Sequence, residues 1–294
     1  MDLAHFTYGP TTKLIFDHKP QLIATGCPSG ASRLTGVIDW VASDWKDKSR
    51  KPRFTSLCYE ATTSRQSEDP NVFKHGKEKG VEVLPWAYYS FVATDFGTEL
   101  RRIIEENKAD YVWLRGGAAQ VAAIMKDVVR LGYKDKAKWI ITYFSLDPVV
   151  AKIAGNAVME GVYGVNSDAG VPTDKGWGID LTKKLFKKYR KKGEISQLYI
   201  TGVHVAMLAH ESIKRALAKV GNPKKLTGKG IIDQYYTIKD FDLGGIAPKT
   251  TINYPNPAMM SQIRMVQWQK DGTIMPITDW IDVPWIYGNP DFED

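Results

Sequence analysis

Residues 108–161 read KADYVWLRGGAAQVAAIMKDVVRLGYKDKAKWIITYFSLDPVVAKIAGNAVMEG and predict a strand, a helix and a second strand. The apolar run Tyr111–Leu114 is typical of a parallel strand that is covered on both faces. Apolar residues then recur every three or four positions from Val121 to Leu131, as on one face of a helix, and Gly132 suits its end. Trp139–Tyr143 predicts the next strand. A parallel strand reached through a helix is a right-handed crossover, so this stretch indicates an α/β sheet.

The two loops that follow these strands are the first places to look for a binding site. In open α/β sheets, ligands bind outside the carboxyl ends of the strands. Here those ends lead into Gly116–Ala119 and Tyr143–Asp147. We therefore expect ligand-binding residues in both segments.

The chain before this stretch repeats the same alternation of strands and helices. The predicted strands are Met1–Phe6, Gln21–Thr25, Phe54–Cys58 and Val81–Leu84; the predicted helices follow Thr11 or Thr12, span Val37–Trp45 and Pro70–Lys79, and begin at the cap Thr94-Asp95. Such alternation is typical of a doubly wound parallel sheet.

The pattern changes after Gly164. Two long helices follow, one ending near Lys192 and one spanning Gln197–Val220. Later, Asp271-Gly272 is a hairpin signal between two apolar runs, Ile263–Trp268 and Ile274–Ile277. Because the second half adds helices and a hairpin without restarting the alternation, we expect two lobes built from non-contiguous segments.

Composition narrows the class of protein. The 294 residues carry a net charge of +7, and no apolar run is long enough to span a bilayer. The start lacks the features of a signal peptide, so we expect a soluble chain. The lysines of 183–192 alternate with apolar residues at helical spacing, which favours a solvated helix face over a nucleic-acid site. Two cysteines, Cys27 and Cys58, are too few for a disulfide framework.

Four segments, in this order along the chain, resemble the type I periplasmic binding proteins. The resemblance is closest to the substrate-binding proteins of branched-chain amino acid ABC transporters, and it rests on Gly155–Ala157 with Glu160–Tyr163, Tyr199–Gly202 through Ala216, Phe241–Ile246, and Arg264–Gly272. Full-length members begin with a signal peptide and two further βα units. The chain therefore resembles a member that lacks about its first quarter. We expect its first lobe to be incomplete, with an exposed sheet edge that lowers stability and invites association.

The resemblance implies two doubly wound parallel-sheet lobes that close like a Venus flytrap on one small ligand. The predicted lobe 1 is residues 1–34 and 165–268, and lobe 2 is 35–164 and 269–294, with three hinge crossings near Ser32–Gly36, Gly164–Ser167 and Trp268–Asp271. The implied function is the extracytoplasmic or periplasmic solute-binding component of an ABC uptake transporter. Its partners would be the ligand and the permease subunits, with no cofactor, metal or nucleic acid.

The resemblance also implies which residues touch the ligand. The Thr7–Thr12 loop corresponds to the family's carboxylate-binding loop, Gly26–Ser29 to its second anchor, and Tyr59–Ser64 to a loop that often carries a tyrosine. The candidate ligand-binding residues are Thr7, Tyr8, Thr11, Gly26, Cys27, Ser29, Tyr59, Thr63, Ala118, Tyr143 and Phe144. Alanines replace a second aromatic at 118–119, and Tyr143 replaces the acid that holds an amino-acid ammonium. This departure favours a small organic acid or amide, although cation–π attraction to Tyr143 keeps leucine-like ligands open.

Each of these residues also has a simpler interpretation. Thr7, Thr11 and Ser29 suit turns and caps, and Tyr143 and Phe144 suit a core. Cys27 fits a small loop residue better than a nucleophile, because no His and acid partner accompanies it.

Two other classes of function share this fold class. An α/β enzyme would need a motif such as G-x-S-x-G, G-x-x-x-x-G-K-[ST] or G-x-G-x-x-G, and none occurs, so we expect no catalysis. His204 and His210 lie within one predicted helix and suit structural roles. A ligand-sensing domain of a receptor or regulator with the same fold stays open, and the sequence upstream in the gene would decide it.

Overall fold

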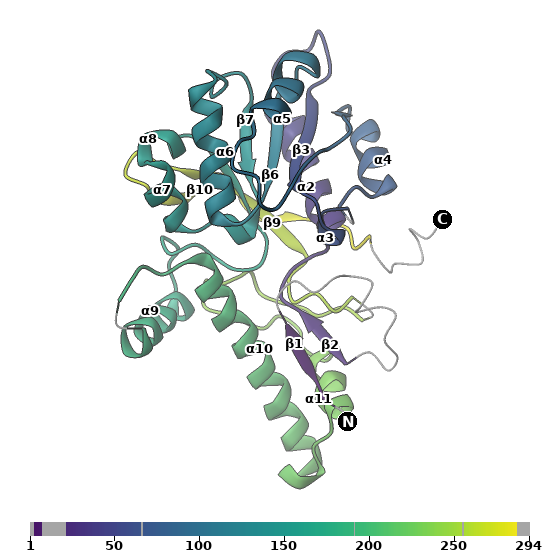
Figure 1. Ribbon diagram of the computed structural model, residues 1–294. Helices are drawn as coiled ribbons and strands as arrows, with labels where there is room; N and C mark the ends of the chain where they lie inside the picture. The colour runs from purple at the N-terminus through teal and green to yellow at the C-terminus, as the bar shows by residue number, and fades with distance from the viewer. Residues whose placement is uncertain (1–2, 8–21, 66, 191, 255, 287–294) are drawn as a thin grey trace. The chain divides into compact units, whose positions relative to one another are not determined.

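The computed structural model describes residues 3–7, 22–65, 67–190, 192–254 and 256–286. The chain divides into two compact units (Figure 1). Unit 1 comprises Met1–Ser29, Ser167–Gln262 and Pro284–Asp294, and unit 2 comprises Gly30–Asn166 and Ile263–Val283. The chain thus passes from one unit to the other four times.

Unit 2 is built on a mixed sheet of nine strands in the described part of the chain. The strands are β3 (Arg53–Tyr59), β4 (Glu82–Val83), β5 (Ala87–Tyr89), β6 (Tyr111–Arg115), β7 (Lys138–Ile141), β8 (Tyr163–Asn166), β9 (Gln262–Trp268), β10 (Ile274–Pro276) and β11 (Ile281–Asp282). Their order is β10-β9-β8-β7-β6-β3-β4, with β5 also paired to β3 and β11 to β9. The pairs from β3 to β8 are parallel, whereas β8–β9 and β9–β10 are antiparallel.

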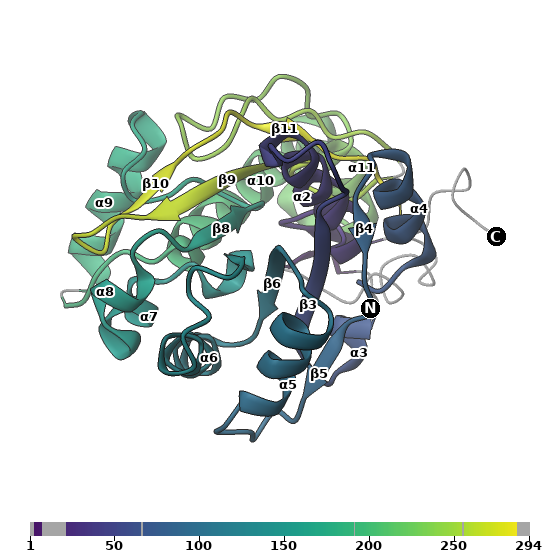
Figure 2. The ribbon, with the colours of Figure 1, turned by 90° about the horizontal axis from the view of Figure 1, so that it is seen from above.

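Helices cover both faces of this sheet. They are α2 (Gly30–Asp44), α3 (Thr62–Arg65), α4 (Pro70–Glu78), α5 (Gly97–Arg101), which continues as a π-helical turn (Arg102–Glu106), α6 (Ala118–Arg130), α7 (Pro148–Ala154) and α8 (Asn156–Met159). Figure 2 shows α5 and α6 on one face and α2 and α4 on the other. With both faces covered, all five residues of β6 are buried, which confirms the buried parallel strand predicted at Tyr111–Leu114.

Unit 1 holds a parallel pair of strands and three helices in its described residues. The pair is β1 (His5–Thr7) with β2 (Ile23–Thr25), and the helices are α9 (Trp177–Tyr189), α10 (Gln197–Val220) and α11 (Gly228–Tyr235). The Ser196 hydroxyl accepts a hydrogen bond from Tyr199 N–H, which caps α10 at its start. Gly221, at φ 66°, ends the helix in the left-handed conformation that glycine adopts without strain.

A buried polar cluster joins α10 to the segment that follows β8. The Asp168 carboxylate accepts hydrogen bonds from the Gln197 amide and from the Thr201 hydroxyl, the latter at 2.9 Å. One turn further on, His204 Nδ1 donates to the Asp168 carbonyl at 2.6 Å. The His204 ring is fully buried, and this burial lowers its pKa to about 4. The neutral ring therefore holds the Asp168 backbone at ordinary pH.

The long helices and the hairpin agree with the sequence analysis. Gln197–Val220 is α10 as predicted, and Ile263–Trp268 with Ile274–Ile277 forms the β9–β10 hairpin around Asp271-Gly272. Asp147 caps α7 by accepting from Val149 N–H at 2.8 Å. The strand expected from Met1 and the helix expected from Thr11 or Thr12 begin outside the described residues.

Three predictions along the chain were wrong in detail. The strand at Val81–Leu84 is only the two residues of β4, and β5 follows it unpredicted. The α5 helix is not capped by Thr94-Asp95: Phe96 is its N-cap, and Asp95 instead accepts from Gly97 N–H at 2.9 Å. The strand expected through Tyr143 ends at Ile141, because residues 143–145 form a 3₁₀ turn.

The predicted lobe boundaries differ from the two units in four places. Residues 30–34 belong to unit 2, because α2 runs unbroken from Gly30. Residues 165–166 and 263–268 also belong to unit 2, because β8 and β9 pair with each other in its sheet. The segment from Pro284 belongs to unit 1.

In the described part of the chain, no helix combines the length and the apolar character needed to cross a bilayer.

Candidate functional site

Tyr59 belongs to a candidate site at the carboxyl edge of the parallel strands in unit 2. It is the last residue of β3, and its hydroxyl lies 3.2 Å from the Thr63 hydroxyl at the start of α3. Its ring meets the exposed ring of Phe91 edge to face, with centroids 5.8 Å apart. The structure thus brings together the two candidate residues predicted in this loop.

Tyr143 and Phe144 follow β7 at the same edge of the sheet. Their rings are perpendicular, with centroids 5.3 Å apart. The Arg33 guanidinium, from the first turn of α2, lies 3.7 Å from the centre of the Tyr143 ring. Tyr143 is buried, so part of its role is in the core, whereas Phe144 is half-buried. A cation already occupies one face of Tyr143.

Arg115 is the site residue that the sequence analysis missed. It is the last residue of β6, and its side chain is buried with only 7% of the residue exposed. Its Nη1 donates to the Ser67 hydroxyl at 2.8 Å, and its guanidinium lies 6.0 Å from the Tyr59 ring centre and 5.8 Å from that of Phe144. Its position just before Gly116-Gly117, at the end of a buried strand, was the signal that could have identified it.

Two helices begin beside these side chains. Helix α6 starts at Ala118 after the N-cap Gly117, and α2 starts at Gly30. Neither helix has an acidic residue in its first turn, and no side chain caps α6. A Cβ built on Gly30 would clash with the Ser67 hydroxyl and lie 3.7 Å from Arg115 Nη1, so α2 begins close to Arg115. Free N–H groups at helix starts favour negative charge.

Ala118 is the first residue of α6 and is half-buried.

The candidate residues of unit 1 lie around the ends of β1 and β2. Gly26 N–H donates to the Thr7 carbonyl at 2.9 Å, which joins the end of β1 to the residue that follows β2. Cys27 is buried, and Ser29 is half-buried. Tyr8 and Thr11 lie outside the described residues.

The edge of unit 2 offers groups suited to binding. It presents aromatic ring faces, guanidinium groups and backbone N–H groups, which together suit a flat, negatively charged molecule. The Cys58 thiol, within β3, is buried, and burial raises its pKa to about 12, so it stays a neutral thiol. Among residues 3–7, 22–65, 67–190, 192–254 and 256–286, no group of three His, Cys, Asp or Glu side chains could hold a metal ion.

Comparison with known proteins identifies the family to which the chain belongs. A family model described as "Periplasmic binding protein" matches residues 17–273. Among solved structures, a branched chain amino acid ABC transporter from Thermus thermophilus with bound valine has a TM-score of 0.76 at 19% identity, over 89% of this chain and 67% of that one. A fatty acid ABC transporter substrate-binding protein from Thermomonospora curvata has a TM-score of 0.77 at 16% identity, over 94% and 69%.

A third structure, a leucine binding protein from Thermotoga maritima, has a TM-score of 0.66 at 17% identity and covers 93% of this chain and 70% of its own. None of the curated proteins matches the chain in sequence. Both the resemblance and the α/β fold class with a mostly parallel sheet are confirmed by these findings. The chain therefore belongs to the type I periplasmic binding protein family.

Proposed function

We propose that this chain is the extracytoplasmic solute-binding component of an ABC uptake transporter, and that it delivers a small ligand to permease subunits without transforming it. The observation that carries the proposal is the cluster at the carboxyl edge of unit 2, where Tyr59, Arg115 and Phe144 come from three successive strand ends. Membership of the family supports it, as do the printed names of the structural neighbours.

The chemistry of this edge favours a small organic acid or amide over an α-amino acid. An ammonium taken out of water needs a carboxylate partner, because an unpaired buried charge is costly. Asp147, the nearest acid after Tyr143, is used to cap α7. An ammonium can also bind to an aromatic ring face. The Arg33 guanidinium, however, already lies 3.7 Å from the centre of the Tyr143 ring. A second cation there would be repelled.

Calorimetric titration tests the proposal and its ligand class together. We expect benzoate or isovalerate to bind with micromolar affinity and leucine to bind at least tenfold more weakly. The Phe144→Ala variant should lose at least about fivefold in affinity, because an aromatic contact contributes about 1 kcal/mol beyond its buried area. Tyr189→Ala, on the exposed face of α9 in unit 1, is the matched control and should bind like the wild type.

Two results would count against this function. Tight binding of leucine or valine with no binding of acids would contradict the ligand class. Reproducible hydrolysis of esters, amides or phosphates that disappears in Cys27→Ala or Ser29→Ala would contradict a pure binding role.

A further inference from the structure

Arg115 is a buried cation whose surroundings in the described residues contain no carboxylate partner. Only 7% of the residue is exposed, and the one hydrogen bond of its side chain within the described residues is the 2.8 Å contact from Nη1 to the neutral Ser67 hydroxyl. Its buried Nε has no hydrogen-bond partner. Buried arginines are normally paired with acids, because a guanidinium loses its hydration in the interior.

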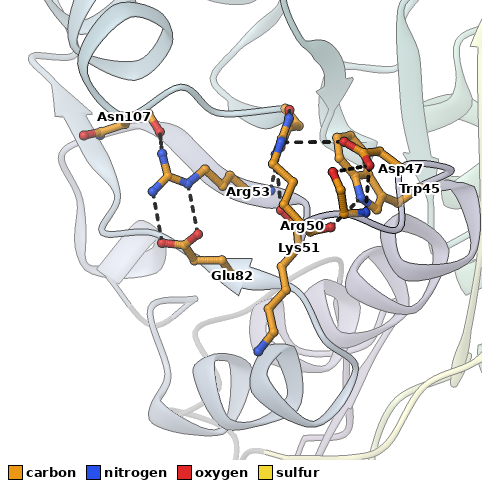
Figure 3. A network of polar contacts seen from close by, with 9 residues as sticks. Trp45, Asp47, Arg50, Lys51, Arg53, Glu82 and Asn107 are labelled. Atoms are coloured by element: carbon orange, nitrogen blue, oxygen red, sulfur yellow. Dashed lines mark hydrogen bonds and ion pairs between the residues drawn. The ribbon is translucent and has the colours of Figure 1, made fainter.

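Arginines at the opposite, amino end of the same sheet show the usual arrangement (Figure 3). Arg50 makes a two-pronged contact with Asp110, with both N–O distances at 2.7 Å. Arg53, the first residue of β3, binds Glu82 at 2.9 Å and the Asn107 carbonyl at 2.9 Å. Both side chains are more exposed than Arg115, yet each has a carboxylate. The lack of a carboxylate partner therefore distinguishes Arg115 from these two arginines.

Glu68 is next to Ser67, the hydrogen-bond partner of Arg115, but its carboxylate contacts other side chains. The Glu68 carboxylate accepts from the Tyr88 hydroxyl at 2.6 Å and lies 3.7 Å from Arg65. It makes no ion pair with Arg115. The charge of Arg115 thus stays uncompensated by the described part of the protein.

Two helix starts and two aromatic rings next to Arg115 suit a planar, negatively charged ligand. The starts of α2 and α6 lie beside it, and neither has an acidic residue in its first turn. The rings of Tyr59 and Phe144 flank the guanidinium at 6.0 and 5.8 Å and form apolar walls. A planar anion that meets the guanidinium edge on would place its body against these rings.

We propose that Arg115 anchors a carboxylate of the transported ligand, and that the ligand class is a small organic acid with a flat or branched apolar body. This inference rests on the proposed function. Arg115 Nη1 is held by Ser67, so the Nε–Nη2 edge is the one left for a two-pronged bond to both carboxylate oxygens. Ligand binding would then complete the ion pair that the protein leaves open.

Matched acid and amide pairs test the anchor. Benzoate with benzamide, and isovalerate with isovaleramide, differ in charge while keeping almost the same shape. We expect Arg115→Gln to weaken binding of each acid at least tenfold and to change binding of each amide less than threefold. Arg115→Lys keeps the positive charge but loses the planar, two-pronged geometry of the guanidinium. Its affinity for each acid should lie between that of Arg115→Gln and that of the wild type. Arg53→Gln, which removes an arginine from the opposite end of the sheet, is the control and should bind as the wild type does.

Thermal unfolding is a second test of the anchor, and it does not require a ligand that binds tightly. Ten millimolar sodium benzoate or acetate should raise the melting temperature of the wild type above that in sodium chloride of equal ionic strength, and should not do so for Arg115→Gln. Circular dichroism confirms that each variant is folded before it is compared.

The outcomes distinguish a failure of the Arg115 anchor from a failure of the proposed solute-binding function. Acids and amides that bind the wild type equally, or an Arg115→Gln variant that keeps full affinity for acids, would overturn the anchor while leaving a solute-binding role intact. If no acid, amide or amino acid binds the folded wild type, and no carboxylate raises its melting temperature, both the anchor and the proposed function are overturned.

Discussion

Replacing Trp113 with alanine is expected to lower the free energy of unfolding by about 3–5 kcal/mol. Trp113 lies in the middle of β6, is 0% exposed, and meets Trp86 edge to face with ring centroids 6.1 Å apart. Alanine removes the apolar area buried by the indole and leaves a cavity next to Trp86 in the core of unit 2. Urea unfolding followed by far-ultraviolet circular dichroism measures the loss, because this signal does not depend on the removed indole.

Val129→Ala is the matched control for this core substitution. Val129 lies on α6 in the same unit, but 41% of it is exposed, so we expect a change of about 0.5 kcal/mol or less. A Trp113→Ala variant as stable as this control would show that β6 is not the central buried strand.

The second large effect is a loss of stability at mildly acid pH that depends on His204. Burial lowers the pKa of His204 to about 4 in the folded chain, whereas an unfolded histidine titrates near 6.5. Between these values the unfolded state binds the extra proton, so stability falls as pH falls from about 6.5 towards 4. The linkage amounts to about 2 kcal/mol at pH 5 relative to pH 8.

Urea unfolding of the wild type and of His204→Leu at the two pH values checks this sign and size. The variant should be less stable at pH 8, because the Asp168 carbonyl loses its donor, but it should lose about 2 kcal/mol less on acidification. His210→Gln is the control, since His210 lies on the same helix with an exposed side chain. A wild type and a His204→Leu variant with the same pH dependence would mean that His204 is not buried and neutral in the fold.

Local patterns were sufficient to predict most of the fold. The buried strand β6, the helix α6 and the 24-residue α10 each have a periodicity that packing on a sheet reinforces, so their existence and type agree with the structure. The ends of the elements were predicted less accurately than their existence and type. The short β5 follows Pro85-Trp86 and pairs with β3 through contacts that no local pattern encodes. The same holds for the lobe boundaries near β9, which depend on pairing between β8 and a strand about one hundred residues away.

The candidate site was predicted in part. The loop after a predicted strand indicated Tyr143 and Phe144, because the carboxyl edge of a parallel sheet is where ligands bind, whereas Tyr59 was indicated by the family resemblance. Arg115 was missed because an arginine at the end of an apolar strand reads as the first exposed residue of a loop. Its burial arises from Ser67 and the start of α2, which are distant in sequence. The cluster of Asp168 with His204 was missed for the same reason, since its members are 36 residues apart.

Hydrogen–deuterium exchange with a bound acid tests the central claim, that the carboxyl edge of unit 2 receives the ligand. The acid that binds most tightly in the titrations is added at saturation, and exchange is followed by mass spectrometry. The account predicts slower exchange in residues 59–65, 116–121 and 142–147, and no change in residues 45–53 at the amino end of the sheet. Protection at residues 45–53 with none at the carboxyl edge would contradict it.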